Sequence, residues 1–483
     1  INKKGEFRLF ILLKMRIKIK GELMKKTVDL VKGDIFKTLL TLSIPILGTS
    51  FIQMAYSLVD MMWIGKVGSA AVAAVGTASF FTWFGNSLVM ITKTGAQVGV
   101  SQAIGKKDEN KKDIYIHTSI FMCSIIAIAY TAFLLIFKDV LIEFFKLGDK
   151  EIISMATNYL VIVSLGMICA FLNPQFTGII TASGNSKLPF KVNTIGLIIN
   201  IVLDPVMIFG IGPFKAMGVK GAAFATVLSQ VMVTLIFIYV FYKMGYRINR
   251  KSFKYLEKNS AKEIIKWGTP SATQNCLFSF FAMLIGRIIA EWGATPIAVQ
   301  KVGSQIESIS WMTADGFSAA LTAFVGQNYG AGQYERVKEG YKKTLMLSSI
   351  LGIFATGLLI FGGEWLFSLF INEPEVIKQG ADYLRILGYS QVFMCLEITT
   401  TGAFFGVGKT MIPSVISTIF TGLRVPAALI LASSLALGVD GVWWSISLSS
   451  VVKGILLVIA FYFMVLKSFK KLNSECSCVN SIS

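Results

Sequence analysis

Two carboxylates stand inside hydrophobic stretches that are long enough to cross a bilayer. Asp60 follows the segment 53–59, and Asp204 lies between Leu203 and Pro205. An ionised carboxylate at membrane depth costs at least a few kcal/mol, so we interpret such a residue first as a functional group. Two aspartates of this kind in the same half of the chain predict an ion- or proton-coupled transporter.

Amide side chains accompany both aspartates at helical spacing. Gln53 lies seven residues before Asp60, whereas Asn193 and Asn200 precede Asp204 in steps of seven and four residues. Each set therefore forms a stripe on one face of a helix. Lipid cannot satisfy these groups, so both stripes must face protein or a water-filled cavity. Hydrogen bonding that only joins helices is an equally good interpretation for the amides, but not for the aspartates.

Prolines occur in the same two stretches. Pro45 shares its hydrophobic stretch with Asp60, and Pro205 directly follows Asp204. A proline inside a helix removes a backbone hydrogen bond, so Pro45 is a predicted bending point of the first helix. The alternative interpretation is an ordinary proline of a membrane helix.

The second half of the chain carries charges of both signs in or near its hydrophobic stretches. Three acids there are alternative coupling residues: Glu307, Asp315 and Glu397. Because Arg287, Lys301 and Arg424 accompany them, internal ion pairing is the simpler interpretation. No acid of the second half aligns with Asp60 or Asp204, since Ile285 falls opposite Asp60. We therefore expect an asymmetric coupling site in the first half.

The composition predicts an all-α polytopic membrane protein. Of the 483 residues, 54% are hydrophobic and only 15% are charged, whereas charged residues approach a quarter of a soluble domain. Apolar segments recur that are each long enough to span the hydrocarbon core. The predicted spans number twelve, with cores at 37–64, 71–98, 115–137, 157–182, 189–211, 221–242, 267–290, 296–325, 344–363, 381–405, 411–434 and 441–466.

The net charge of +19 reflects membrane orientation and does not predict nucleic-acid binding. With twelve spans, 33 of the 46 Lys and Arg residues lie on the side of the termini, 8 lie on the opposite side and 5 lie within spans. Basic residues mark the cytoplasmic face of a membrane protein. Both termini are therefore predicted to be cytoplasmic.

The chain repeats itself after about half its length. The segments 99–105, 184–189 and 217–221 have counterparts at 326–332, 408–413 and 437–441. Each half holds six predicted spans, so both halves enter the membrane in the same orientation, as parallel repeats do. The predicted organisation is a basic N-terminal segment 1–33, an N-lobe 34–242, an inter-lobe linker 243–266, a C-lobe 267–466 and a tail 467–483.

The sequence gives no support for enzymatic chemistry. It contains neither a phosphate-binding glycine loop nor HExxH or GxSxG. We expect no cofactor. The chain begins at Ile1, and Met24 is a more natural start, so we interpret residues 1–23 as an upstream extension or a disordered segment.

The chain resembles MATE (multidrug and toxic compound extrusion) transporters of the prokaryotic DinF-type branch, over essentially all of residues 34–466. The segments that carry the resemblance are Pro45 with Gln53 and Leu58-Val59-Asp60, then Asn200-x-x-Leu203-Asp204-Pro205, Gly221–Thr226, Gln305–Ile309 and Val325–Gly332. This resemblance implies two six-helix lobes in a V shape and the export of cationic or amphipathic compounds by H⁺ or Na⁺ antiport.

The resemblance also implies a cation-responsive site in the N-lobe. The matching residues here are Gln53, Asp60, Tyr159, Asn200, Asp204 and Thr226. No metal site is expected apart from Na⁺ as a coupling ion at Asp60 and Asp204. The implied protein is a monomer in the bacterial cytoplasmic membrane that binds small cationic or hydrophobic substrates and no nucleic acid.

Two other functions compete with this interpretation. One is a flippase for lipid-linked saccharides of the same superfamily, although such proteins commonly differ in span count and lack the pattern around the two aspartates. The other is a membrane receptor or enzyme, which would require a catalytic cluster or a large extramembrane domain.

Overall fold

A computed structural model describes residues 28–211, 215–246, 256–433 and 437–469. Within these ranges the chain is helical and contains no strand. The predicted extension 1–23, the candidate start at Met24 and most of the tail lie outside the described residues. The prediction of an all-α membrane protein is confirmed.

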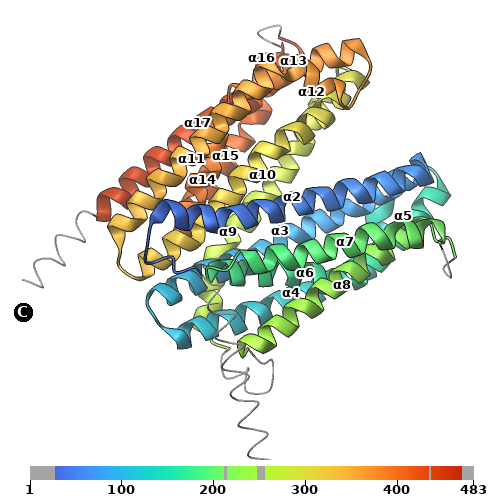
Figure 1. Cartoon of the computed structure of the whole chain (residues 1–483). Helices are drawn as coiled ribbons and strands as arrows, with labels where there is room; N and C mark the ends of the chain where they lie inside the picture. The colour runs from blue at the N-terminus through green and yellow to red at the C-terminus, as the bar shows by residue number, and fades with distance from the viewer. Residues whose placement is uncertain (1–27, 212–214, 247–255, 434–436, 470–483) are drawn as a thin grey trace, which may run out of the picture. The chain divides into compact units, whose positions relative to one another are not determined.

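Long apolar helices dominate the first half of the chain (Figure 1). They are α2 (Ile35–Val67), α3 (Ser69–Gly105), α4 (Glu109–Glu143), α5 (Lys150–Leu165), α6 (Met167–Ala182), α7 (Lys187–Phe209) and α8 (Val219–Met244). Contacts join α7 to α8, and α5 and α6 to both α4 and α8. Helices α4 to α8 therefore form one bundle.

The second half repeats this pattern with more breaks. Its elements are α9 (Lys258–Ala290), α10 (Ala294–Gly330), α11 (Tyr334–Phe361), α12 (Gly363–Ser368), α13 (Pro374–Gly388), α14 (Gln391–Gly406), α15 (Met411–Gly422), α16 (Arg424–Ser433), α17 (Val439–Phe461) and the π-helical turn η2 (Tyr462–Leu466). Helix α14 packs against α10, α11 and α17, which makes it central to this bundle.

Each of the twelve predicted spans coincides with one helix or with consecutive helices. Nine helical segments of the described chain are long and apolar enough to cross a membrane, or ten if α5 and α6, which meet at 50°, are one span. The spans predicted at 296–325 and 381–405 correspond to α10 and to α13 with α14. Charged and hydroxyl residues lie along α10 and α13.

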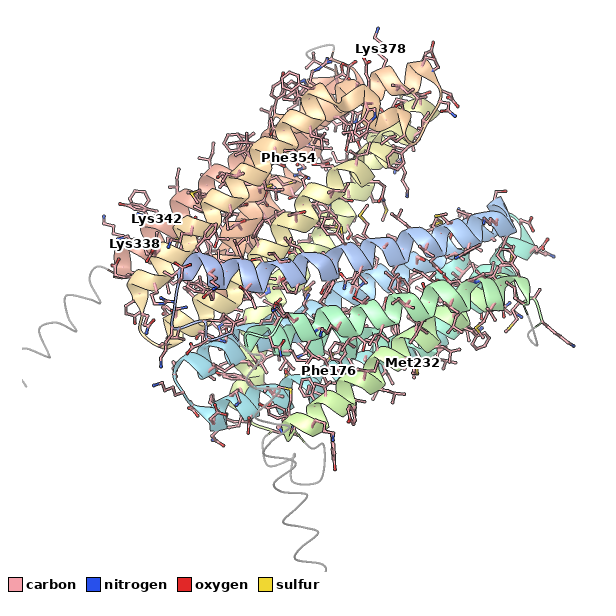
Figure 2. All side chains as sticks on the ribbon, in the orientation of Figure 1. Phe176, Met232, Lys338, Lys342, Phe354 and Lys378 are labelled. Atoms are coloured by element: carbon pink, nitrogen blue, oxygen red, sulfur yellow. The ribbon has the colours of Figure 1, made fainter. Side chains whose placement is uncertain are left out.

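Apolar side chains fill the interior of the bundles and also cover their outer surfaces. Phe176, labelled in Figure 2, is buried against Phe237 and Phe241, with ring centroids 5.7 and 4.8 Å apart. By contrast, Met232 and Phe354 are 44% and 68% exposed. Large exposed apolar side chains on both bundles suit a surface that faces lipid.

The chain divides into two compact units that share three helices. Gly48–Val100 and Glu109–Ile265 belong to the first, whereas Leu30–Leu47, Ser101–Asp108 and the chain from Lys266 onwards belong to the second. The beginning of α2, the end of α3 and most of α9 therefore pack within the second unit. The predicted lobes at 34–242 and 267–466 are continuous in sequence, so they assign the beginning of α2 and the end of α3 to the N-lobe.

Candidate functional site

Helix α7 carries the best-defined part of the candidate site. Asp204 lies one turn after Asn200, and both residues are completely buried. Asn200 Nδ2 donates a 2.9 Å hydrogen bond to Asp204 Oδ1. This bond lies along the predicted polar stripe, so the amide orients the carboxylate. The helix continues through Pro205 to Phe209, where Gly210 adopts a left-handed conformation at the C-cap.

Close backbone approaches hold α7 against its neighbours in the first unit. A Cβ atom on Gly221, at the start of α8, would lie 2.3 Å from the carbonyl oxygen of Met207. A Cβ atom on Gly48 of α2 would lie 2.4 Å from the ring of Phe190 on α7. The approach of Gly221 to a backbone carbonyl permits only glycine, whereas the Phe190 ring beside Gly48 could shift, and both contacts bring α2 and α8 next to the helix that carries Asp204.

Helix α2 supplies the second carboxylate and a tyrosine. Asp60 is half-buried, and its Oδ1 atom is fully buried. Tyr56 lies one turn earlier, and its hydroxyl group donates a 3.4 Å hydrogen bond to the backbone carbonyl of Thr226 on α8. Tyr56 interacts electrostatically with both Asp60 and Asp204, which in turn interact with each other. The two carboxylates therefore share one site.

Tyr159 of α5 closes the site from another side. It is 4% exposed, interacts electrostatically with Asp60, Asp204 and Tyr56, and its hydroxyl group lies within reach of Ser79 on α3. Thr226 is also buried. Five helices of the first unit thus converge on the two aspartates.

Several oxygen atoms in this site are buried but have no hydrogen-bond partner among the described residues. They are Asp60 Oδ1, Asp204 Oδ2, Asn200 Oδ1 and Thr226 Oγ1. No Lys, Arg or His of the described chain forms an ion pair with either aspartate. Buried charge and buried acceptors are costly unless something neutralises or binds them. This arrangement of oxygens suits a proton or a small oxygen-liganded cation.

Gln53 and Pro45 also lie on α2, but their surroundings differ from those of the buried group. Gln53 is exposed on α2, and no described residue accepts or donates a hydrogen bond to its side chain; its backbone carbonyl accepts one from Ser57. Pro45 lies inside α2, which is helical without interruption, and belongs to the part of α2 that packs in the second unit. Of the predicted site residues, Asp60, Tyr159, Asn200, Asp204 and Thr226 come together.

The alternative acids of the second half lie in a different environment. Gln391 of α14 donates a 2.9 Å hydrogen bond to Glu307 of α10 and accepts one from Ser310 at 2.7 Å. Glu397 forms a 2.9 Å ion pair with Lys453. Asp315 is exposed on α10.

Arg424 links Glu307 and Glu397. Its guanidinium group donates hydrogen bonds to Ser449 and Ser450 and interacts electrostatically with Glu307 and Glu397. We call Glu307, Glu397, Arg424 and Lys453 the C-half cluster. It holds two acids and two bases, so its formal charges balance.

The sequence analysis did not identify two residues of these sites: Tyr56, beside the two aspartates, and Lys453, in the C-half cluster. Tyr56 lies between Gln53 and Asp60 at helical spacing, so its place on their stripe was the available signal. Lys453 lies within the last predicted span, and an ionisable residue at that depth is itself a signal of a buried partner.

Known proteins resemble this chain along most of its length. The family model MatE matches it twice, at residues 45–206 and 270–430. A probable multidrug resistance protein, NorM, from Thermotoga maritima is 31% identical over 413 residues, which cover 85% of this chain and 88% of the relative. A FAD transporter from Shewanella oneidensis is 27% identical and covers 75% of this chain and 80% of the relative.

Solved structures share the fold. A MOP superfamily transporter from Pyrococcus furiosus superimposes with a TM-score of 0.84 at 24% identity, covering 92% of this chain and 99% of that chain. The two matches of the family model fall on the two halves that the repeated sequence segments mark.

Proposed function

The chain belongs to the MATE family, and on this premise we propose that it is a secondary antiporter that exports small cationic or amphipathic compounds in exchange for H⁺ or Na⁺. The Thermotoga relative is a probable multidrug resistance protein. The Shewanella relative is a transporter, which argues against an enzyme. The protein is a multi-pass membrane protein, and its bacterial relatives support the cytoplasmic membrane as its location.

The pair of aspartates carries this proposal. Asp60 and Asp204 share a largely buried site, interact with each other, and have no basic partner in the described chain. An antiporter needs a group whose charge changes when the coupling cation binds, because a ligand that binds both conformations equally shifts neither. Two carboxylates without a counter-ion meet that requirement.

The proposed cycle follows from the cost of burying charge. In the outward-facing state both aspartates are ionised, and Asn200 orients Asp204. Entry of the coupling cation neutralises the site, which removes the penalty of closing it away from water. Closure then bends α2 near Pro45 and expels the substrate. One charge that crosses a 100 mV potential supplies about 2.3 kcal/mol for each cycle.

Proteoliposomes test the function and the coupling ion together. The purified protein is reconstituted with a fluorescent cationic dye, and a pH gradient and a Na⁺ gradient are imposed separately. Dye movement driven by one gradient, and abolished when that gradient is collapsed, is the expected result. Dye movement that is absent under both gradients contradicts the antiport proposal. Translocation of a lipid-linked oligosaccharide by the same vesicles would favour the flippase alternative.

The orientation is also part of the proposal, with both termini and the segment between the halves in the cytoplasm. Lys262, near the start of α9, and Asn372, in the loop before α13, are exposed. Cysteines introduced at these positions should react with an impermeant reagent from opposite sides of the membrane. Reaction from the same side contradicts the twelve-span topology. Lys251 would serve equally by sequence but lies outside the described residues.

A flavin nucleotide is a second candidate substrate, because one relative carries the function of a FAD transporter. The same proteoliposomes, loaded with FAD in place of the dye, distinguish the two. Gradient-driven movement of FAD without movement of dye would identify a metabolite exporter that keeps the proposed coupling site.

A further inference from the structure

The second half contains a buried ion pair that the proposed transport cycle does not use. Lys453 Nζ lies 2.9 Å from Glu397 Oε1, and the two side chains are only 6% and 9% exposed. Ser417 Oγ donates a 3.0 Å hydrogen bond to the same carboxylate oxygen. Lys453, Glu397 and Ser417 belong to α17, α14 and α15, so three helices meet at one carboxylate.

Backbone packing holds Lys453 in place. A Cβ atom on the adjacent Gly454 would lie 2.4 Å from the carbonyl oxygen of Phe393, which precedes Glu397 by one turn on α14. Helix α17 is therefore pressed against α14 at this level. This helix contact fixes the position of the Lys453 ammonium group beside the carboxylate of Glu397.

The surroundings of the Glu397 carboxylate resemble those of a carboxylate that binds a cation. A single positive charge lies at contact distance from a buried carboxylate oxygen, which also receives one hydroxyl group. The further charged neighbours are Arg424, which interacts with both Glu397 and Lys453, and Glu307, which interacts with Arg424. Removal of Lys453 therefore leaves Glu397 without its contact partner, and Arg424 remains as the nearby positive charge.

We propose that Lys453 is a tethered counter-ion that fills a latent site for a monovalent cation at Glu397. Its covalent attachment makes the C-half cluster insensitive to the coupling cation, so that only the N-half aspartates respond. This consequence for coupling rests on the proposed antiport function, whereas the latent site itself can be measured without transport.

The test compares two variants of the full-length protein in detergent. Lys453→Met removes the tethered cation and leaves Glu397, whereas the double variant Lys453→Met, Glu397→Gln removes both charges. Thermal unfolding is recorded at alkaline pH in NaCl and in choline chloride at equal ionic strength. Any response to Na⁺ at Asp60 and Asp204 is common to both variants, so the difference between them isolates Glu397.

We expect Na⁺ to raise the unfolding temperature of Lys453→Met by about 3 °C more than that of the double variant, because a cation that binds only the folded state stabilises it. Equal responses to Na⁺ in the two variants overturn the proposal and leave the pair as a structural contact. If Lys453→Met does not yield folded protein, Lys453→Gln takes its place, since its amide can still donate to Glu397. Loss of transport in the N-half variants does not affect this measurement.

Discussion

The two halves of the protein bury acidic side chains in opposite ways. In the first half, Asp60 and Asp204 share a site that no basic side chain of the described chain enters. In the second half, Glu397 is paired with Lys453, and Glu307 is held by Gln391. The first arrangement leaves two carboxylates without a basic partner, whereas the second pairs its acids with basic or amide side chains.

The scaffold beneath these sites is the same in both halves. Gly221 at the start of α8 packs on the carbonyl oxygen of Met207, and Gly441 at the start of α17 packs on the backbone of Leu431 and Ala432. A Cβ atom on either glycine would lie less than 3 Å from these backbone atoms. The repeat has therefore kept the helix contacts that position the polar residues.

The chemistry placed on this scaffold has diverged. By the offset that relates Gly184 to Gly408, Asn200 corresponds to Arg424 and Asp204 corresponds to Ala428. A guanidinium group thus stands where the first half has the amide that orients its carboxylate. An unpaired buried carboxylate costs more free energy than a paired one, so this difference is consistent with the coupling role that we propose for the first half.

The largest expected effect concerns transport by the N-half aspartates. Asp60→Asn and Asp204→Asn keep side-chain size but remove the charge, so each should lower gradient-driven efflux by at least about tenfold, the factor for 1.4 kcal/mol. Dye efflux from proteoliposomes with matched protein content measures this. Asp315→Asn, an exposed acid of the second half, is the control and should remain close to wild type. Full efflux by the double aspartate variant would refute the assignment.

The second effect concerns stability, and we expect it to be large for the second half and small for the first half. Glu397→Gln leaves the buried ammonium group of Lys453 without its partner and should lower the free energy of unfolding by about 3 kcal/mol. Asp204→Asn removes an uncompensated charge and should cost much less. Thermal unfolding of both purified variants measures the contrast. A larger loss of stability in Asp204→Asn would show that the N-half site is a structural network.

Much of this contrast was predictable from the sequence. The stripes around Asp60 and Asp204, the repeat and the absence of matching acids in the second half indicated an asymmetric protein, because helical periodicity and burial are local properties. The Asn200–Asp204 hydrogen bond follows directly from a spacing of four residues.

Contacts between distant segments were not predictable in this way. The Lys453–Glu397 pair joins residues on α17 and α14, and Tyr56 reaches the backbone of Thr226 on α8. Neither contact has a fixed spacing in the sequence, since helix packing decides both. Helix packing also decides which residues of a stripe are buried. Gln53 shares a stripe with Asp60 but is exposed.

A moderate effect on transport is expected from the tyrosines. Tyr56→Phe removes a hydroxyl group that donates to Thr226 beside both aspartates, and it should slow efflux by about fivefold, as the loss of one hydrogen bond of about 1 kcal/mol implies. Tyr383 is the repeat counterpart of Tyr159 and interacts with Glu307 and Arg424. Tyr383→Phe removes a buried tyrosine hydroxyl group from the second half, so it is a control for that kind of substitution, and its efflux should be close to wild type. Equal slowing of efflux by both substitutions would contradict the proposal that transport depends on the first-half site and not on the C-half cluster.

The smallest effect is expected at Gln53. The sequence places this amide on the stripe of Asp60, but its side chain is exposed. Gln53→Ala should therefore change efflux by less than about twofold, as is usual for a substitution without a buried partner. Asn200→Ala provides the comparison, because it removes the 2.9 Å bond to Asp204 and should have a clearly larger effect in the same assay. If Gln53→Ala is as severe as Asn200→Ala, then Gln53 enters the site during the transport cycle, and its exposure on α2 belongs to only one of the conformations.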